Sequence, residues 1–114
     1  MQELIKALKA LSDETRLRIL NLLLERECCV CEVMQAIGIS QSRASRNLGI
    51  LKDAGFLKSR REGAWMLYSM DGETMNHYAP QLARLLKGFL PTNETLAEDR
   101  TRLKQTVRTG PGCR

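Results

Sequence analysis

Two short helical stretches joined by only three residues are the feature that most limits how this chain can fold. Apolar residues recur at helical spacing in residues 30–37 and again in residues 41–54. Gly38 favours the end of the first stretch, and Ser40 is a good N-cap for the second. A link this short is typical of a helix-turn-helix, whose second helix reads DNA.

Two runs rich in strand-forming residues follow the second helix, at residues 56–61 and 64–70. Glu62 and Gly63 join them, and glycine suits the tight turn of a β-hairpin. A basic hairpin placed directly after a DNA-reading helix is the wing of a winged helix. We therefore predict a mainly α fold with a small β-hairpin, a winged helix-turn-helix.

Helices are also expected on both sides of this unit. We predict a first helix over residues 2–11, and a second that Ser12 caps and that runs to about Leu24. Arg26–Cys29 is then a short link. A fifth helix should run from Asp71 or Gly72 to about Gly88, before Pro91.

The chain is expected to form one domain with an extension. Residues 1–90 would be the DNA-binding and dimerisation domain, and residues 91–114 a partly helical extension with a flexible, cysteine-containing tail. Residues 93–108 have helical composition but a thin apolar face. They therefore form either a docked helix or a frayed one.

Positive charge is concentrated in one segment. Of the formal net charge of +5, a net +4 falls in residues 40–63, which hold six basic and two acidic residues. This distribution is expected of a surface that contacts phosphates. No apolar run approaches the ~18 residues needed to cross a bilayer, and the first residues lack a signal-peptide core. We expect no membrane partner and a cytoplasmic location.

The exposed side chains of the predicted reading helix suit contacts with base edges. Arginine pairs with guanine, glutamine or asparagine with adenine, and serine with a base or a phosphate. We therefore expect double-stranded operator DNA as a partner. The candidate DNA-contacting residues are Gln41, Ser42, Arg43, Ser45, Arg46 and Asn47 on the helix, and Lys58, Arg60 and Arg61 on the hairpin.

The first and fifth helices carry more apolar surface than a small core needs. Ile5 and Leu8 represent the first stripe, and Leu85 and Phe89 the second. One winged helix covers only one half-site, and such readers commonly pair. We predict a homodimer formed through these two helices.

Three of the four cysteines, Cys28, Cys29 and Cys31, lie within four residues, directly before the helix-turn-helix. In a reducing compartment, clustered cysteines favour metal or redox chemistry over a disulfide framework. Thiolates select soft metal centres. A thiol near a helix N-terminus has a lowered pKa, although Glu27 and Glu32 act in the opposite direction.

These motifs together resemble the ArsR/SmtB family of metalloregulatory repressors over about residues 3–90. The resemblance rests on the Leu-Ser-Asp-Glu-Thr-Arg-Leu-Arg-Ile-Leu run at 11–20, the Cys-Val-Cys-Glu run at 29–32 and the Ser-Gln-Ser-Arg-Ala-Ser-Arg-Asn-Leu run at 40–48. It implies a homodimeric repressor, not an enzyme, that leaves its operator when it binds metal. The Cys-Val-Cys-Glu motif is similar to that of arsenite and antimonite sensors. The implied inducer is As(III) or Sb(III), bound by Cys29 and Cys31, without an organic cofactor.

The chain differs from that family pattern at two positions. Met34 stands where such sensors often have a third cysteine, and Asn47 replaces the histidine of the usual Ser-x-His-Leu motif. We expect Met34 to fill the core. The third ligand is then Cys28, our preferred candidate, or Cys113 from the tail, or none.

Helix geometry predicts how inducer binding could act. On a regular helix, Cys29 and Cys31 point about 200° apart, so they cannot share one ligand. Binding both would therefore require the first turn of the third helix to be extended or unwound. That helix is adjacent to the reading helix, so unwinding would shift the residues that contact DNA.

Other functions remain open beside this one, among them a DNA-binding regulator without any inducer. The thiols could instead form a disulfide as a redox or sulfide sensor, or bind Cd(II) or Pb(II) in the same fold. A zinc or cobalt sensor is disfavoured because His77 has no partner histidine farther along its helix. A thiol enzyme would need His77 as its base, and nothing in the sequence places it near the cysteines.

Overall fold

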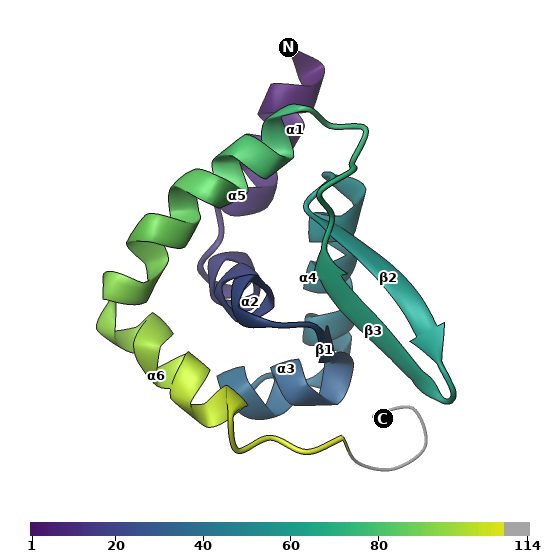
Figure 1. Cartoon of the computed structure of the whole chain (residues 1–114), viewed down its shortest axis with the longest axis vertical. Helices are drawn as coiled ribbons and strands as arrows, with labels where there is room; N and C mark the ends of the chain where they lie inside the picture. The colour runs from purple at the N-terminus through teal and green to yellow at the C-terminus, as the bar shows by residue number, and fades with distance from the viewer. Residues whose placement is uncertain (109–114) are drawn as a thin grey trace.

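The computed structural model of the chain describes residues 1–108 and has six α-helices, one 3₁₀ turn and three strands in that range. The helices surround a central α2, and the hairpin projects to one side (Figure 1). This architecture confirms the predicted winged helix-turn-helix. In chain order the elements are α1 (Gln2–Leu11), α2 (Glu14–Glu25), β1 (Cys28–Cys29), α3 (Val30–Ile37), α4 (Gln41–Asp53), β2 (Leu57–Glu62), β3 (Trp65–Met70), α5 (Tyr78–Phe89), η1 (Leu90–Thr92) and α6 (Glu94–Leu103).

The turn between α3 and α4 forms as predicted. Gly38 adopts the left-handed conformation, with φ of 80°, and ends α3. The Ser40 hydroxyl accepts a hydrogen bond from the Arg43 N–H at 3.2 Å and so caps α4. Ala44, Leu48 and other inward residues of α4 are fully buried. Gly38 and Ser40 therefore set where α3 ends and where α4 begins.

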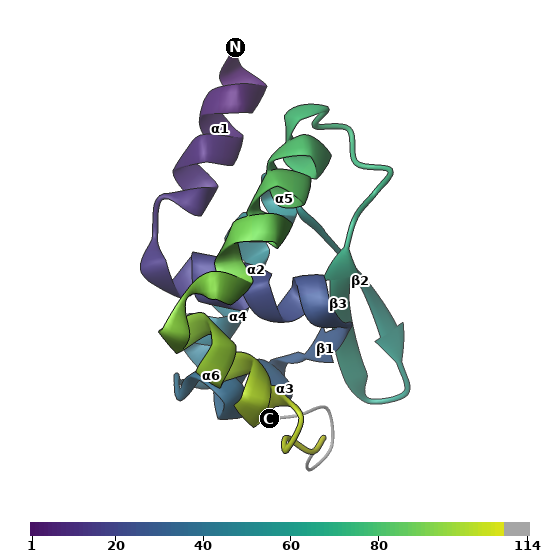
Figure 2. The ribbon, with the colours of Figure 1, turned by 60° about the vertical axis from the view of Figure 1, so that its left-hand side comes forward.

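The sheet contains one strand that the sequence did not predict. Its order is β1-β3-β2, and both pairs are antiparallel (Figure 2). The two-residue strand β1 pairs Cys28 with Tyr68 and Cys29 with Leu67. Two residues are too few to show the alternation of a strand, so the expected link at this position gave no signal of pairing.

The first residue of α2 is set by a different cap from the one predicted. Asp13, not Ser12, is the N-cap, and its carboxylate accepts from the Arg16 N–H at 3.0 Å. The Ser12 hydroxyl instead donates to the Leu8 carbonyl and closes the end of α1. Serine and aspartate can both act as N-caps, and the N-cap of α2 is Asp13, one residue after Ser12.

Helix α5 begins at Tyr78 rather than at Asp71 or Gly72, because residues 71–77 form a loop over the end of α4. The Asn76 side chain donates to the carbonyls of Ala54 and Glu3, at 2.9 and 3.0 Å. Its oxygen accepts from the Tyr78 N–H at 3.0 Å. Asn76 therefore satisfies the end of α4 and the start of α5 at once, which a longer α5 would prevent.

Helix α6 docks against α2 and α3, the first of the two options for residues 93–108. Leu96 and Leu103 face the core, and the Asn93 side chain caps the helix. Asp99 is fully buried and accepts two hydrogen bonds from Arg18, at 2.8 and 2.9 Å. Helical structure ends at Leu103. A thin apolar face is sufficient here because a buried ion pair adds to the contact.

Helices α1 and α5 pack against each other and bury their small residues, Ala7 and Ala10 on α1 and Ala79 and Ala83 on α5. Some of their large apolar side chains, such as Leu82 and Leu86, pack partly buried against the core, and others stay exposed. The exposed ones include Ile5, Leu8, Leu85 and Phe89. No helix within residues 1–108 is long and apolar enough to cross a membrane.

Candidate functional site

The start of α4 presents an exposed polar surface. Gln41, Ser42, Arg43, Ser45 and Arg46 are all exposed, as expected of residues that reach DNA. The Arg43 guanidinium donates to the Thr15 hydroxyl of α2 at 3.0 Å, which steadies its side chain. Five of the six helix residues predicted to contact DNA are therefore exposed, and their contact with DNA stays a prediction.

Asn47 is placed differently from that prediction, because it is buried against α2. Its side-chain oxygen accepts from Arg16 at 3.1 Å, and its amide donates to the Arg43 carbonyl at 2.9 Å. Arg16 also donates to the Ala10 carbonyl at 2.6 Å. Asn47 therefore ties α4 to α2 and to the end of α1. No local sequence pattern signals this tie, because Arg16 lies 31 positions before Asn47.

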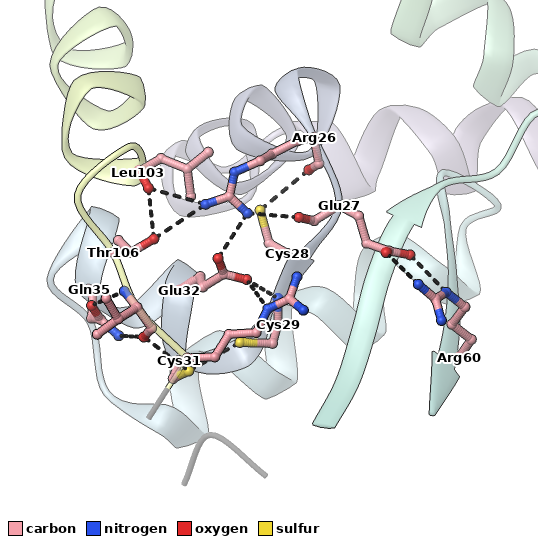
Figure 3. Close-up of polar contacts among 12 residues, drawn as sticks. Arg26, Glu27, Cys28, Cys29, Cys31, Glu32, Gln35, Arg60, Leu103 and Thr106 are labelled. Atoms are coloured by element: carbon pink, nitrogen blue, oxygen red, sulfur yellow. Dashed lines mark hydrogen bonds and ion pairs between the residues drawn. The ribbon is translucent and has the colours of Figure 1, made fainter. Parts of the chain in front are cut away.

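The three basic residues of β2, Lys58, Arg60 and Arg61, are exposed. Arg60 is nevertheless paired within the chain (Figure 3). Its Nη2 and Nε lie 2.8 and 3.1 Å from the carboxylate oxygens of Glu27, and its Nη1 contacts Glu62. Lys58 and Arg61 have no ion pair with any residue in 1–108. The positive charge of the wing is therefore partly offset on the Arg60 side.

Cys29 and Cys31 bring their sulfurs together, 3.1 Å apart (Figure 3). Both residues are buried, and with Leu67 they form a small apolar cluster against which Trp65 packs. Cys29 belongs to β1, which pairs with the wing strand β3, and Cys31 lies in the first turn of α3. The sulfur pair thus sits at the junction of the wing and the helix-turn-helix.

The expected conflict between this pair and helix geometry does not arise. Cys29 is the N-cap of α3, with extended φ and ψ of −89° and 169°, and the helix begins only at Val30. An extended residue followed by a helical one turns the two side chains toward each other. The sulfurs therefore converge while α3 stays intact, and unwinding of its first turn is not needed.

The structure does not bring Cys28 to this pair. Neighbouring residues of a strand point to opposite faces, and Cys28 packs in the main core with residues of α2 and α4. Its thiol contacts the Arg26 carbonyl at 3.3 Å (Figure 3). As a third ligand, Cys28 would have to leave the core. Met34 also packs against the main core, as expected.

Glu32 organises the residues around the sulfur pair. It is buried, and its carboxylate accepts from the Cys29 N–H at 2.9 Å. Ion pairs join it to Arg26 at 2.9 Å and to Arg108 at 3.1 Å. Burial alone would raise the pKa of Glu32, but these three donors outweigh burial and lower it. The Cys-x-x-Glu spacing of a capping box was the sequence signal for this contact.

Burial, rather than proximity to the helix N-terminus, determines how the pKa values of the Cys28 and Cys29 thiols are shifted. It raises the pKa of Cys28 to about 12. Burial also raises the pKa of Cys29, and the hydrogen bond from the Glu32 N–H offsets that shift only in part. The expected lowering of the thiol pKa at this helix end is therefore wrong for these two residues.

The end of the described chain lies over the sulfur pair. The Val107 carbonyl is 3.8 Å from the Cys31 sulfur, and the Gln35 side chain holds the Val107 backbone. Cys113, the other candidate third ligand, lies outside the described residues. Within residues 1–108, no three His, Cys, Asp or Glu side chains form a group that could hold a metal ion. Among these residues, the sulfurs of Cys29 and Cys31 are the candidate ligands that lie together.

Sequence comparisons identify relatives over most of the chain. The family described as "Bacterial regulatory protein, arsR family" matches residues 13–59. The arsenic resistance transcriptional regulator ArsR1 of Pseudomonas putida is 40% identical over 100 residues, 85% of this chain and 74% of that protein. A homologue of the cadmium resistance regulatory protein CadC from Staphylococcus aureus is 46% identical over 72 residues, 62% of this chain and 60% of its own length.

Solved structures show the same fold. The transcriptional repressor BigR of Xylella fastidiosa has a TM-score of 0.67 at 33% identity, covering 82% of this chain and 88% of its own. The homodimeric winged helix-turn-helix domain of Mb0332 from Mycobacterium bovis has a TM-score of 0.66 at 33% identity, covering 76% and 77%. These likenesses place the chain among DNA-binding regulators and not among enzymes. It belongs to the arsR family of bacterial regulatory proteins.

Proposed function

We propose that this protein is a homodimeric repressor that leaves operator DNA when trivalent arsenic or antimony binds Cys29 and Cys31. The observation that carries the proposal is the position of the sulfur pair. One sulfur belongs to the strand that pairs with the wing, and the other to the helix that packs against α4, with 3.1 Å between them. A centre bound to both sulfurs therefore acts on both DNA-contacting parts.

The chemistry of the pair suits a thiophilic centre. Soft thiolates select soft centres, whereas an imidazole would favour zinc, and the chain's single histidine, His77, belongs to the start of α5. Burial raises the pKa of the Cys29 thiol. A metalloid that binds its thiolate must therefore displace the proton, which lowers the net binding free energy. Cys29 and Cys31 are the ligands we assign. Cys28 stays in the core in this arrangement, and a third ligand from Cys113 is tested by substitution.

DNA binding is assigned to α4 and the wing. Gln41, Ser42, Arg43, Ser45 and Arg46 would contact bases and phosphates, and Lys58, Arg60 and Arg61 would contact phosphates. The homodimer is assigned to the exposed apolar faces of α1 and α5, which include Ile5 and Phe89. The homodimeric relative from Mycobacterium bovis supports this state.

The experiment is a binding titration with a labelled duplex from the region upstream of this chain's own gene. Reduced wild-type protein should bind the duplex and release it when arsenite is added. A hundredfold release corresponds to about 2.7 kcal/mol of coupling. Cys29→Ser and Cys31→Ser should bind the duplex normally and lose the release. Cys113→Ser shows whether the tail supplies a ligand.

Retention of arsenite release by both Cys29→Ser and Cys31→Ser would falsify the site. Antimonite and cadmium, run in parallel, rank the inducers, and cadmium is included because one relative carries cadmium resistance in its name. Trp65, the chain's single tryptophan, packs against the cluster that Cys29 and Cys31 form with Leu67, so its fluorescence should report metalloid binding without DNA.

A second candidate function is redox sensing, which the short sulfur–sulfur distance favours. Peroxide would oxidise two thiols to one disulfide, with release of two water molecules. The same duplex titration with peroxide in place of arsenite tests this alternative. Release by peroxide but not by arsenite would assign the pair to redox sensing instead.

A further inference from the structure

Glu27 and Arg60 connect the loop before the cysteines to the wing. Glu27 lies between α2 and β1, one residue before Cys28, and Arg60 lies on β2. Two hydrogen bonds join them, at 2.8 and 3.1 Å, and they span the width of the sheet (Figure 3). A paired guanidinium and carboxylate hold a fixed relative orientation.

Strand register places this pair beside the sulfurs. Cys29 pairs with Leu67 on β3, and Leu67 pairs with Arg60 on β2. The three residues therefore form one row across the sheet, and directly paired residues share a face. Cys29 and Leu67 are buried in the sulfur cluster. Arg60 therefore lies in the same row of the sheet as that cluster, and its guanidinium reaches Glu27.

The Arg60 guanidinium is therefore already paired with carboxylates of this chain. It contacts two carboxylates, Glu27 from the cysteine loop and Glu62 from its own strand. An arginine held by a carboxylate cannot give the same donors to a DNA phosphate, because both ligands use the same fork of N–H groups. Only the Glu27 contact links two separate parts of the molecule.

We propose that Glu27 competes with DNA phosphates for Arg60, and that this exchange couples the state of the sulfur pair to the wing. The coupling rests on the proposed function, whereas the competition does not. When DNA binds, Arg60 leaves Glu27 for a phosphate. When the sulfurs hold an inducer, the loop that carries Glu27 is fixed beside the wing, Glu27 retains Arg60, and one phosphate contact is lost.

The size of the effect follows from the exposure of the pair. The side chain of Arg60 is 54% exposed and that of Glu27 is 29% exposed. Exposed ion pairs change an equilibrium constant by at most about fivefold. Glu27 therefore tunes DNA binding and release, and it does not by itself account for a full hundredfold response.

The first arm of the test measures affinity without any inducer. Reduced protein is titrated against the same upstream duplex at several salt concentrations. Glu27→Gln should bind about twofold more tightly than wild type. In the Arg60→Gln background, Glu27→Gln should bring no gain, because the competed group is absent. Glu98→Gln on exposed α6 makes the same charge change away from the wing and should leave affinity unchanged.

The second arm measures coupling with arsenite, comparing two carboxylates that contact the same arginine. In Glu27→Gln, the ratio of affinities without and with arsenite should fall about twofold. In Glu62→Gln, that ratio should match wild type, because Glu62 moves with the wing. Because the coupling is reciprocal, the arsenite affinity of the free protein, read from Trp65 fluorescence, should fall by the same factor of about two in Glu27→Gln and should match wild type in Glu62→Gln.

The outcomes separate the two ideas. An equal gain from Glu27→Gln with and without Arg60, or no gain at all, overturns the competition. An unchanged release ratio in Glu27→Gln overturns the coupling. If arsenite neither changes Trp65 fluorescence nor releases wild-type protein, the proposed function fails, and the first arm still decides whether Glu27 competes with DNA.

Discussion

The side-chain amide of Gln35 binds the backbone of Val107 in both directions. Its nitrogen donates to the Val107 carbonyl at 2.6 Å, and its oxygen accepts from the Val107 N–H at 3.1 Å. Arg108, the next residue, reaches Glu32 beside the sulfur pair. Gln35, on the helix that carries Cys31, therefore holds Val107 next to the Cys31 sulfur.

Loss of the Gln35–Val107 hydrogen bonds should make the Cys31 thiol more accessible. Gln35→Ala deletes two hydrogen bonds that are worth about 1 kcal/mol each at most in net terms. We expect alkylation of Cys31 by N-ethylmaleimide in the reduced protein to accelerate about fivefold, as read by site-resolved mass spectrometry. Gln81→Ala, on the exposed face of α5, is the control and should react at the wild-type rate. Equal rates for both variants would show that Val107 does not restrict access.

Cys28 should behave as a core residue. Cys28→Ala leaves a small cavity among buried leucines, so we expect the free energy of unfolding to fall by about 1–2 kcal/mol. Arsenite release should persist in Cys28→Ala and disappear in Cys29→Ala. Chemical denaturation and the duplex titration measure the two effects. Loss of release in the stably folded Cys28→Ala protein would make Cys28 a ligand after all.

The Cys28 thiol should also resist alkylation at neutral pH. Burial raises its pKa to about 12, so the reactive thiolate is scarce well below that value and grows only as the pH approaches it. In reduced, folded protein at pH 7.5, N-ethylmaleimide should leave Cys28 unmodified, and in denaturant it should modify all four cysteines. Rapid modification of Cys28 in the folded protein would contradict its place in the core.

Asn47 and Arg46 are neighbours in sequence, but substituting Asn47 should mainly lower stability, whereas substituting Arg46 should mainly weaken DNA binding. Asn47→Ala removes the link to Arg16 and should lower the free energy of unfolding by about 1–2 kcal/mol. Arg46→Ala removes an exposed charge, so stability should stay within about 0.5 kcal/mol. In the duplex titration, Arg46→Ala should reduce the salt slope by about one unit. Asn47→Ala should leave that slope unchanged.

The contrast between Arg46 and Asn47 shows which features of the structure can be predicted from local sequence patterns. Periodicity and capping predicted the helices, the turn at Gly38 and the hairpin, because those signals lie within a few residues of one another. The Arg16–Asn47 tie joins residues 31 positions apart, and periodicity cannot distinguish a polar residue that faces DNA from one that faces a neighbouring helix. Asn47 was therefore wrongly expected to be exposed.

The cysteines show the same limit at shorter range. Their clustering and their position beside the helix-turn-helix were readable, and the Cys-x-x-Glu spacing is local. The separation of Cys28 from Cys29 depends on β1 pairing with β3, almost forty residues later, and so did not follow from local spacing. Once Cys29 is part of that strand, it precedes the helix, and the expected need for unwinding disappears.

Gly55 should not tolerate a side chain. It has a φ of 94°, and a Cβ built there would lie 2.5 Å from the Thr74 hydroxyl and 2.7 Å from the Asn76 Cβ. Gly55→Ala forces both an unfavourable backbone and movement of the loop that joins β3 to α5. We expect a loss of about 2–3 kcal/mol in the free energy of unfolding, as measured by denaturant titration.

Gly49 is the matched control, because it lies in the middle of α4 and a Cβ built there meets nothing within 4 Å. Alanine is about 1 kcal/mol more favourable than glycine inside a helix, so Gly49→Ala should stabilise the protein by up to about that amount. The two Gly→Ala changes therefore act in opposite directions. If Gly55→Ala were as stable as wild type, residues 74–76 would not pack closely on the end of α4, and the loop around Asn76 would no longer explain why α5 begins as late as Tyr78.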